Sequence, residues 1–171
     1  MKNLILVAVL LLTVSALSFA QPNVSATATA TGTIIAPIAI TKTVDMNFGN
    51  IIAGAALGTV VLTPAGTRSA TGGAFLPTSI PGTITAASFT VTGATGFAYA
   101  ITLPAAATTV TSGGNTMTVD TWTSTPTVAT GGTLTGGTQT LTVGGTLNVA
   151  ANQAAGLYVS GTAFSVTVHY N

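Results

Sequence analysis

Side chains able to do chemistry are few in this chain. It has no cysteine and a single histidine, His169, so thiolate and multi-histidine metal sites are excluded. A hydrolase triad needs a base and a residue that orients it, and His169 lies on the polar face of an alternating terminal segment. The two carboxylates, Asp45 and Asp120, show no sign of meeting as a glycosidase pair must. We therefore expect no catalytic residue, no metal, no cofactor and no enzyme activity.

Charge is also scarce. Of 171 residues, three are Lys or Arg and two are Asp or Glu, which is 3% charged, against about 25% in an average soluble protein. Three basic residues cannot form a nucleic-acid-binding surface, so no nucleic acid is expected as a partner. Hydrophobic residues make up 47% of the chain, a composition opposite to that of disordered proteins.

The first twenty residues have the layout of a secretory signal peptide. Lys2 gives a positive start, Leu4–Leu12 is apolar, and small residues precede a cleavage site after Ala20. We expect export through the Sec pathway, with the periplasm in transit and the cell surface or medium as destination. The mature chain, residues 21–171, keeps two basic and two acidic side chains, a formal charge of zero that favours association. It contains no apolar stretch long enough for a transmembrane helix.

The residue pattern of the mature chain predicts many short strands. Large apolar residues alternate with Thr and Ser, the period of a strand with one buried face. The apolar members of these segments are Phe89 and Val91; Phe97, Tyr99, Ile101 and Leu103; Met117 and Val119; Leu141 and Val143; and Phe164, Val166, Val168 and Tyr170. The continuous run Val60–Leu62 predicts a strand covered on both faces.

Glycine pairs separate these segments and are typical of turns. They are Gly72–Gly73, Gly113–Gly114, Gly131–Gly132, Gly136–Gly137 and Gly144–Gly145. Many short strands with glycine-rich turns and no helix predict one β-sandwich domain over residues 21–171, immunoglobulin-like or pilin-like. The frequent Thr-x-Thr motifs lack the fixed repeat of an ice-binding array, so we expect outward-facing strand residues.

The single tryptophan, Trp122, breaks the parity of Met117 and Val119. It therefore either faces outward or follows a β-bulge. Core packing is the favoured interpretation, because tryptophan is highly buried on average. The alternative makes Trp122 a ligand contact, since sugar-binding sites commonly stack an aromatic ring on the ligand.

The mature N-terminus carries small apolar residues at every second position, within residues 21–35. They are Val24, Ala26, Ala28, Ala30 and Ile34. Two interpretations are open: the first strand of the domain's own sheet, or a donor strand that completes a neighbouring subunit's sheet. In the second case Phe164, Val166, Val168 and Tyr170 are the candidate wall of the receiving groove.

Several segments together resemble a family of bacterial secreted proteins known as domain of unknown function 4402. They are Ile34–Thr43 (IIAPIAITKT), Met46–Ile51 (MNFGNI), Ala86–Gly93 (AASFTVTG), Gly113–Val119 (GGNTMTV), Gly145–Val149 (GTLNV) and Gly161–Tyr170. The resemblance covers nearly the whole mature chain. It implies an all-β sandwich without an agreed activity, similar in style to cysteine-free pilin subunits.

The chain end adds a second resemblance. A penultimate tyrosine after an alternating last strand is also a feature of chaperone–usher pilins, and Tyr170 has that place. Those pilins commonly carry a glycine where this chain has Tyr158, which is a departure from their pattern. We expect a non-enzymatic, pilin-like surface subunit that assembles with its own copies by strand addition, with a periplasmic chaperone and usher as further partners. The alternative is a monomeric adhesin or carbohydrate-binding module.

Overall fold

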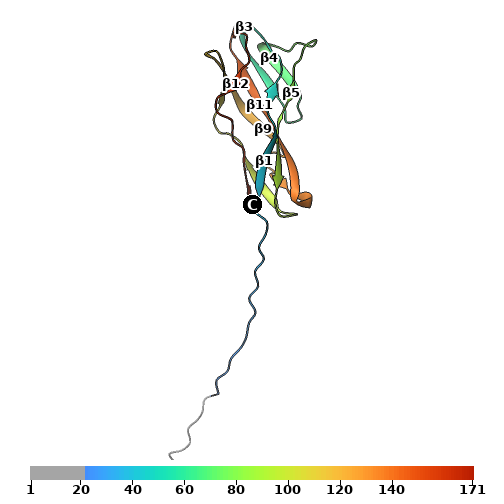
Figure 1. The fold of residues 1–171 in the computed structure, drawn as a ribbon, viewed down its shortest axis with the longest axis vertical. Helices are drawn as coiled ribbons and strands as arrows, with labels where there is room; N and C mark the ends of the chain where they lie inside the picture. The colour runs from blue at the N-terminus through green and yellow to red at the C-terminus, as the bar shows by residue number, and fades with distance from the viewer. Residues whose placement is uncertain (1–21) are drawn as a thin grey trace, which may run out of the picture. The chain divides into compact units, whose positions relative to one another are not determined.

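A computed structural model describes residues 22–171, so the predicted signal peptide lies outside the described residues. In the described chain the fold is all-β, with thirteen strands and one short 3-10 turn, η1 (Thr135–Gly137) (Figure 1). The strands are β1 (Ala39–Val44), β2 (Asn47–Phe48), β3 (Ile52–Leu62), β4 (Arg68–Phe75), β5 (Ile84–Thr85), β6 (Ala87–Thr92), β7 (Ala98–Thr102), β8 (Thr108–Ser112), β9 (Asn115–Thr125), β10 (Gly132–Thr133), β11 (Thr138–Val149), β12 (Val159–Ser160) and β13 (Thr167–Tyr170). The all-β sandwich predicted from the alternating pattern is confirmed.

All strand pairs are antiparallel, and β11 lies at the centre of the larger sheet. The order of that sheet is β1-β6-β11-β9-β8-β12, while β3 also pairs with β11 and β4 pairs with β3. A second sheet has the order β10-β7-β13, and β2 pairs with β5. Residues 35–171 form one compact unit, which contains every strand.

The register between β6 and β11 explains why threonine is so frequent. Leu141 is the partner of Phe89, and both point to the core, whereas the next pair along the ladder is Thr140 with Thr90. Thr41 of β1 continues this row of hydroxyls across a third strand. Because side chains alternate between the two faces of a strand, the threonines cover the outer face, as expected.

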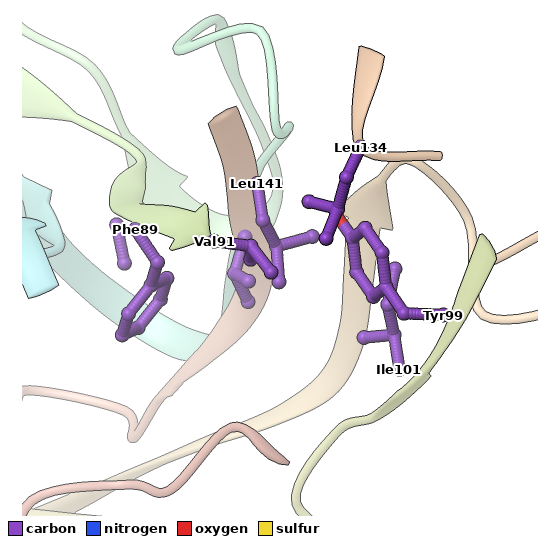
Figure 2. Packing of buried hydrophobic residues seen from close by; sticks show 8 residues of the cluster. Phe89, Val91, Tyr99, Ile101, Leu134 and Leu141 are labelled. Carbon is purple, nitrogen blue, oxygen red and sulfur yellow. The ribbon is translucent and has the colours of Figure 1, made fainter. Parts of the chain in front are cut away.

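Two clusters of buried side chains form the core. The first combines residues of β6, β7 and β11 with Leu134, and Figure 2 shows Tyr99 and Leu134 packed within it. The second contains Val60, Val119, Leu147 and Val149 with the smaller Ala74. Val60 is fully buried whereas Val61 is 38% exposed. The prediction that Val60–Leu62 is covered on both faces is therefore wrong, because Val61 occupies an outward position.

Two of the glycine pairs expected at turns lie inside strands instead. Gly72–Gly73 belongs to β4 and Gly144–Gly145 to β11. A Cβ on Gly73 would collide with the carbonyl of Ala56, because residues 54–57 bulge out of β3 across from it. A Cβ on Gly144 would collide with the carbonyl of Leu62. Close backbone approach, rather than a turn, requires glycine at these positions.

Tyr99 gives a test of the core. Its ring is fully buried and its hydroxyl has no hydrogen-bond partner among the described residues. An unpaired buried hydroxyl is destabilising, so Tyr99→Phe should raise the free energy of unfolding at pH 7 by about 1 kcal/mol. Burial also raises the pKa of Tyr99 above its ordinary value of 10.0. The folded state therefore favours the neutral phenol, and stability falls once the pH exceeds 10.0 and the unfolded phenol ionises.

Urea titrations of the wild type and of Tyr99→Phe at pH 7 and pH 11 check both effects. The variant should be more stable at pH 7 and should lose less stability at pH 11. A less stable variant at pH 7 would show that the hydroxyl is satisfied in solution.

Candidate functional site

The N-terminal segment is exposed along its described length. Val24 is 94% exposed and Ile34 is fully exposed, and the alanines between them are exposed as well. Residues 22–34 form no strand, so the first strand of the domain is β1, which begins at Ala39. The segment that carries the alternating small apolar side chains is therefore not paired with another strand in the described residues. The donor-strand interpretation stays a prediction.

The C-terminal segment packs on the first core cluster with four half-buried side chains, Phe164, Val166, Val168 and Tyr170. The predicted strand over residues 164–170 is shorter in the structure, where β13 pairs with β7 only over Thr167–Tyr170. The register places Pro104 opposite residue 165, and proline has no N–H to donate to a ladder. Residues 163–166 therefore lie against the core without belonging to any strand.

Tyr170 ties the chain end to two other segments. Its hydroxyl accepts a hydrogen bond from the Ala94 amide at 2.6 Å and donates one to the Ala36 carbonyl at 2.9 Å. Its ring packs on Phe97 with the centroids 5.6 Å apart. Gly93 leaves the space that this hydroxyl fills, because a Cβ there would collide with it. The penultimate tyrosine singled out in the sequence is thus a structural tie between β13 and the residues before β1.

Trp122 follows a β-bulge, which is one of the two explanations offered for its parity. Asp120 pairs with Thr146 and Thr123 pairs with Gly144, so Thr121 and Trp122 together face Gly145 alone. Thr121 has a φ of 49°, a left-handed conformation that is costly for a β-branched residue. The bulge turns the indole inward, where it is half-buried against both core clusters.

A cleft of about 420 Å³ opens beside this bulge. Asp120, Thr121 and Trp122 line it from β9, and residues 101–107 line it from the end of β7 and the loop that follows. The Asp120 carboxylate accepts hydrogen bonds from the Asn148 amide at 2.9 Å and the Thr121 hydroxyl at 3.0 Å. Only the tryptophan of this group was visible as a candidate in the sequence; Asp120 was considered there solely as a catalytic acid.

The remaining candidates for chemistry lie apart. Asp45 forms an exposed ion pair with Lys42 at 2.7 Å, while Asp120 is held by Asn148 in the larger sheet. His169 is exposed on β13. Residues 22–171 contain no group of three or more His, Cys, Asp or Glu side chains placed to hold a metal ion. Over the same part of the chain, no helix is long and apolar enough to cross a membrane.

Comparison with known protein families decides the classification. The model of the family described as Domain of unknown function (DUF4402) matches residues 38–170. The chain belongs to the DUF4402 family. The DUF4402 match begins one residue before β1 and ends at the last residue of β13, so it spans all the strands and leaves residues 22–37 outside it. No curated protein and no solved structure matches the chain.

The tyrosine tie can be tested by removing one oxygen. Tyr170→Phe leaves the Ala94 amide and the Ala36 carbonyl without their partner, and should lower the free energy of unfolding by about 1–2 kcal/mol. Tyr158→Phe is a control, because its hydroxyl also makes two hydrogen bonds but only within residues 153–158. Urea unfolding that shows equal losses for both variants would contradict a special role for Tyr170.

The strained bulge gives a second test. Thr121→Gly relieves the left-handed conformation of a β-branched residue and should raise the free energy of unfolding by about 1 kcal/mol. Thr123→Gly is the control, because Thr123 has the same side chain two positions along β9 but no positive φ, and there glycine should be destabilising. Thermal unfolding of the two variants should therefore shift in opposite directions, and a shared loss would refute strain at Thr121.

Proposed function

We propose that this DUF4402 protein is a non-enzymatic structural subunit of a bacterial surface assembly, and that its copies join by strand addition. The observation that carries the proposal is the segment at residues 22–34, which is exposed, forms no strand and alternates small apolar with hydroxyl side chains. An extended segment of this kind gains backbone hydrogen bonds and buries alternate side chains when it pairs with the free edge of another sheet.

The acceptor edge is the C-terminal segment, residues 163–170. Within residues 22–171, β13 pairs with β7 on one side and has no partner strand on the other, and residues 163–166 belong to no strand. The side chains of Phe164, Val166 and Val168 remain half-buried, so apolar surface stays accessible along this edge. A donor strand lying here would bury that surface and pair with the open backbone groups.

Other long edges of the domain carry features that oppose strand addition. β1 follows Pro37, contains Lys42 and has an irregular register between Lys42 and Val44. β4 begins at Arg68, whose guanidinium donates to the carbonyls of Phe48, Asn50 and Pro81 and so holds other backbone segments there. Charged residues, prolines and bulges are the usual protection of a sheet edge. β13 has no proline, bulge, Lys, Arg, Asp or Glu.

The partners follow from this exposed edge. Copies of the same chain meet little electrostatic repulsion, since the described residues carry two basic and two acidic side chains. An open apolar edge is also an aggregation hazard before assembly, so a periplasmic chaperone that covers β13 and an usher that orders the exchange complete the proposal. Export through the Sec pathway would bring the subunit to these partners and then to the cell surface.

Two substitutions on opposite faces of the donor segment test the proposal. Ala28→Asp places a charge among the apolar side chains, which a donor strand would bury, and should abolish oligomers because burying an unpaired carboxylate is costly. Thr29→Asp places the same charge on the hydroxyl face and should leave assembly intact. Sedimentation velocity and electron microscopy of the purified chain measure the outcome. Wild-type oligomers from Ala28→Asp, or equal loss from both variants, would contradict strand addition through this face.

A further inference from the structure

Gly32 occupies a position in the donor segment that the fold of its own subunit does not explain. It continues the row of small apolar residues between Ala30 and Ile34. Among the described residues, no atom lies within 4 Å of the place where a Cβ on Gly32 would be, and its φ is outside the left-handed range. Neither close approach nor backbone conformation within the subunit requires glycine here. The neighbour that this glycine accommodates is therefore sought on the acceptor edge of another copy.

The acceptor edge has its bulkiest side chain at Phe164. This ring packs on Phe89 and Trp122 and remains half-buried. It lies at the end of the edge where residues 163–166 belong to no strand. Directly opposite side chains on neighbouring strands have their Cβ atoms only about 4.5–5.5 Å apart. A glycine opposite an aromatic residue relieves this crowding, and the ring in turn covers the bare backbone.

Placing Gly32 opposite Phe164 leaves two directions for the donor strand. If the donor is antiparallel to β13, a small residue faces a larger one at each following inward position; these pairs are Ala30 with Val166 and Ala28 with Val168. If the donor is parallel, Ile34 faces Val166 and the next inward position falls on Ala36. The Ala36 carbonyl already accepts a hydrogen bond from Tyr170 of its own subunit. The antiparallel direction is the one that keeps the donor's own domain clear of the edge.

The hydrogen bond between Tyr170 and Ala36 also determines from which end a donor strand arrives. It fixes Ala36 beside the last residue of β13. β1 begins three residues after Ala36 and comes close to β13, near the C-terminus (Figure 1). The Tyr170 end of the edge is thus flanked by the subunit's own chain. A donor that arrives from the Phe164 end has its own domain beyond Phe164 and runs antiparallel to β13, as all the strand pairs in the described residues do.

The same tie prevents a subunit from capping its own edge in this direction. Because Ala36 is held at the Tyr170 end, the segment of the same copy could lie along its own β13 only in the parallel direction. Folding back would also need a chain reversal before β1, and residues 22–38 contain no turn or bend. The edge of an unassembled subunit therefore stays open to a second copy.

We propose that the donor segment of one copy binds antiparallel to β13 of the next, with Gly32 opposite Phe164. This inference rests on the proposed function and adds the direction and the register of strand addition. The Tyr170 end of each copy then lies next to the Phe164 end of its neighbour. The contact joins two different surfaces, so it repeats head to tail and gives an open filament rather than a closed dimer.

Introduced cysteine pairs test the direction, because the natural chain has no cysteine. A disulfide needs Cα atoms within about 7 Å, a distance that directly opposite residues satisfy and that residues four positions apart along a strand exceed. Under mild oxidation, Thr31→Cys with Ser165→Cys and Thr29→Cys with Thr167→Cys should each give a ladder of linked oligomers on a non-reducing gel. Thr33→Cys with Thr167→Cys should give none. All five positions are exposed and on the outward face, and each single cysteine should stop at dimers.

The outcomes separate this inference from the proposed function. A ladder from Thr33→Cys with Thr167→Cys, or from Thr29→Cys with Thr167→Cys alone, would mean a parallel donor and would overturn the direction while strand addition stands. Oligomers that none of the three pairs can link would overturn both the direction and the use of this edge. A wild-type chain that stays monomeric contradicts the proposed function and the inference with it.

A pair of leucine substitutions tests the register. Gly32→Leu puts a large side chain opposite Phe164 and should weaken association of the full chain at least about tenfold, because overpacking costs about 1–3 kcal/mol. Thr33→Leu puts the same side chain on the outward face and should leave association unchanged. Both positions are exposed in the single subunit, so circular dichroism should show the same fold for both. Sedimentation velocity measures association, and wild-type assembly of Gly32→Leu would overturn the register.

Discussion

The change of register between β11 and β9 is the constraint on which the rest of the domain depends. β11 pairs with β6, β3 and β9, and its inward residues contribute to both core clusters, Leu141 to one and Leu147 to the other. Between them, a Cβ on Gly144 would collide with the Leu62 carbonyl, and a Cβ on Gly145 would make tight contacts with Val119 and Trp122. The extra residue is taken up by Thr121 on β9. The glycine pair thus lies between the residues that β11 gives to the two core clusters, and Gly145 lies opposite the bulge beside the cleft.

The second sheet imposes a different constraint, because the ladder between β7 and β13 is short. Among the described strands β13 pairs only with β7, and Pro104 stops this ladder after four residues. Phe164 and Val166 nevertheless stay on the core, since Phe164 packs on Trp122 and on Phe89, 6.5 Å away between centroids. Apolar packing therefore holds a backbone segment that has no ladder. A strand added along this edge would supply hydrogen-bond partners for the backbone groups of such a segment.

Residues with strict alternation were predictable from the sequence. Tyr99 and Ile101, and Phe89 and Val91, lie in the core as their period of two predicted, because burial of one face fixes which residues point inward. For Trp122 the sequence predicted only that it departs from the alternation of Met117 and Val119. The reason is that a bulge shifts the alternation of inward and outward side chains by one residue.

Features that depend on a second segment were not predictable. Gly72–Gly73 and Gly144–Gly145 have the composition of turns, but the chain that passes across them determines their role. The length of the last strand was set by Pro104, about sixty residues earlier in the chain, through a register that sequence alone does not give. The partnership of Asp120 with Asn148 similarly needs β9 and β11 to be neighbours.

The few charged side chains are held in place by hydrogen bonds and an ion pair. Each of the four charged side chains in the described residues has a defined partner: Lys42 binds Asp45, Arg68 binds three backbone carbonyls, and Asp120 is held by Asn148 and Thr121. The outer face of the larger sheet consists largely of threonine, as in the row of Thr41, Thr90 and Thr140. Hydroxyls keep such a face hydrated without giving it a field that repels a copy. A domain built in this way can lie close to identical neighbours, and its specificity must come from backbone edges and side-chain shape rather than from charge.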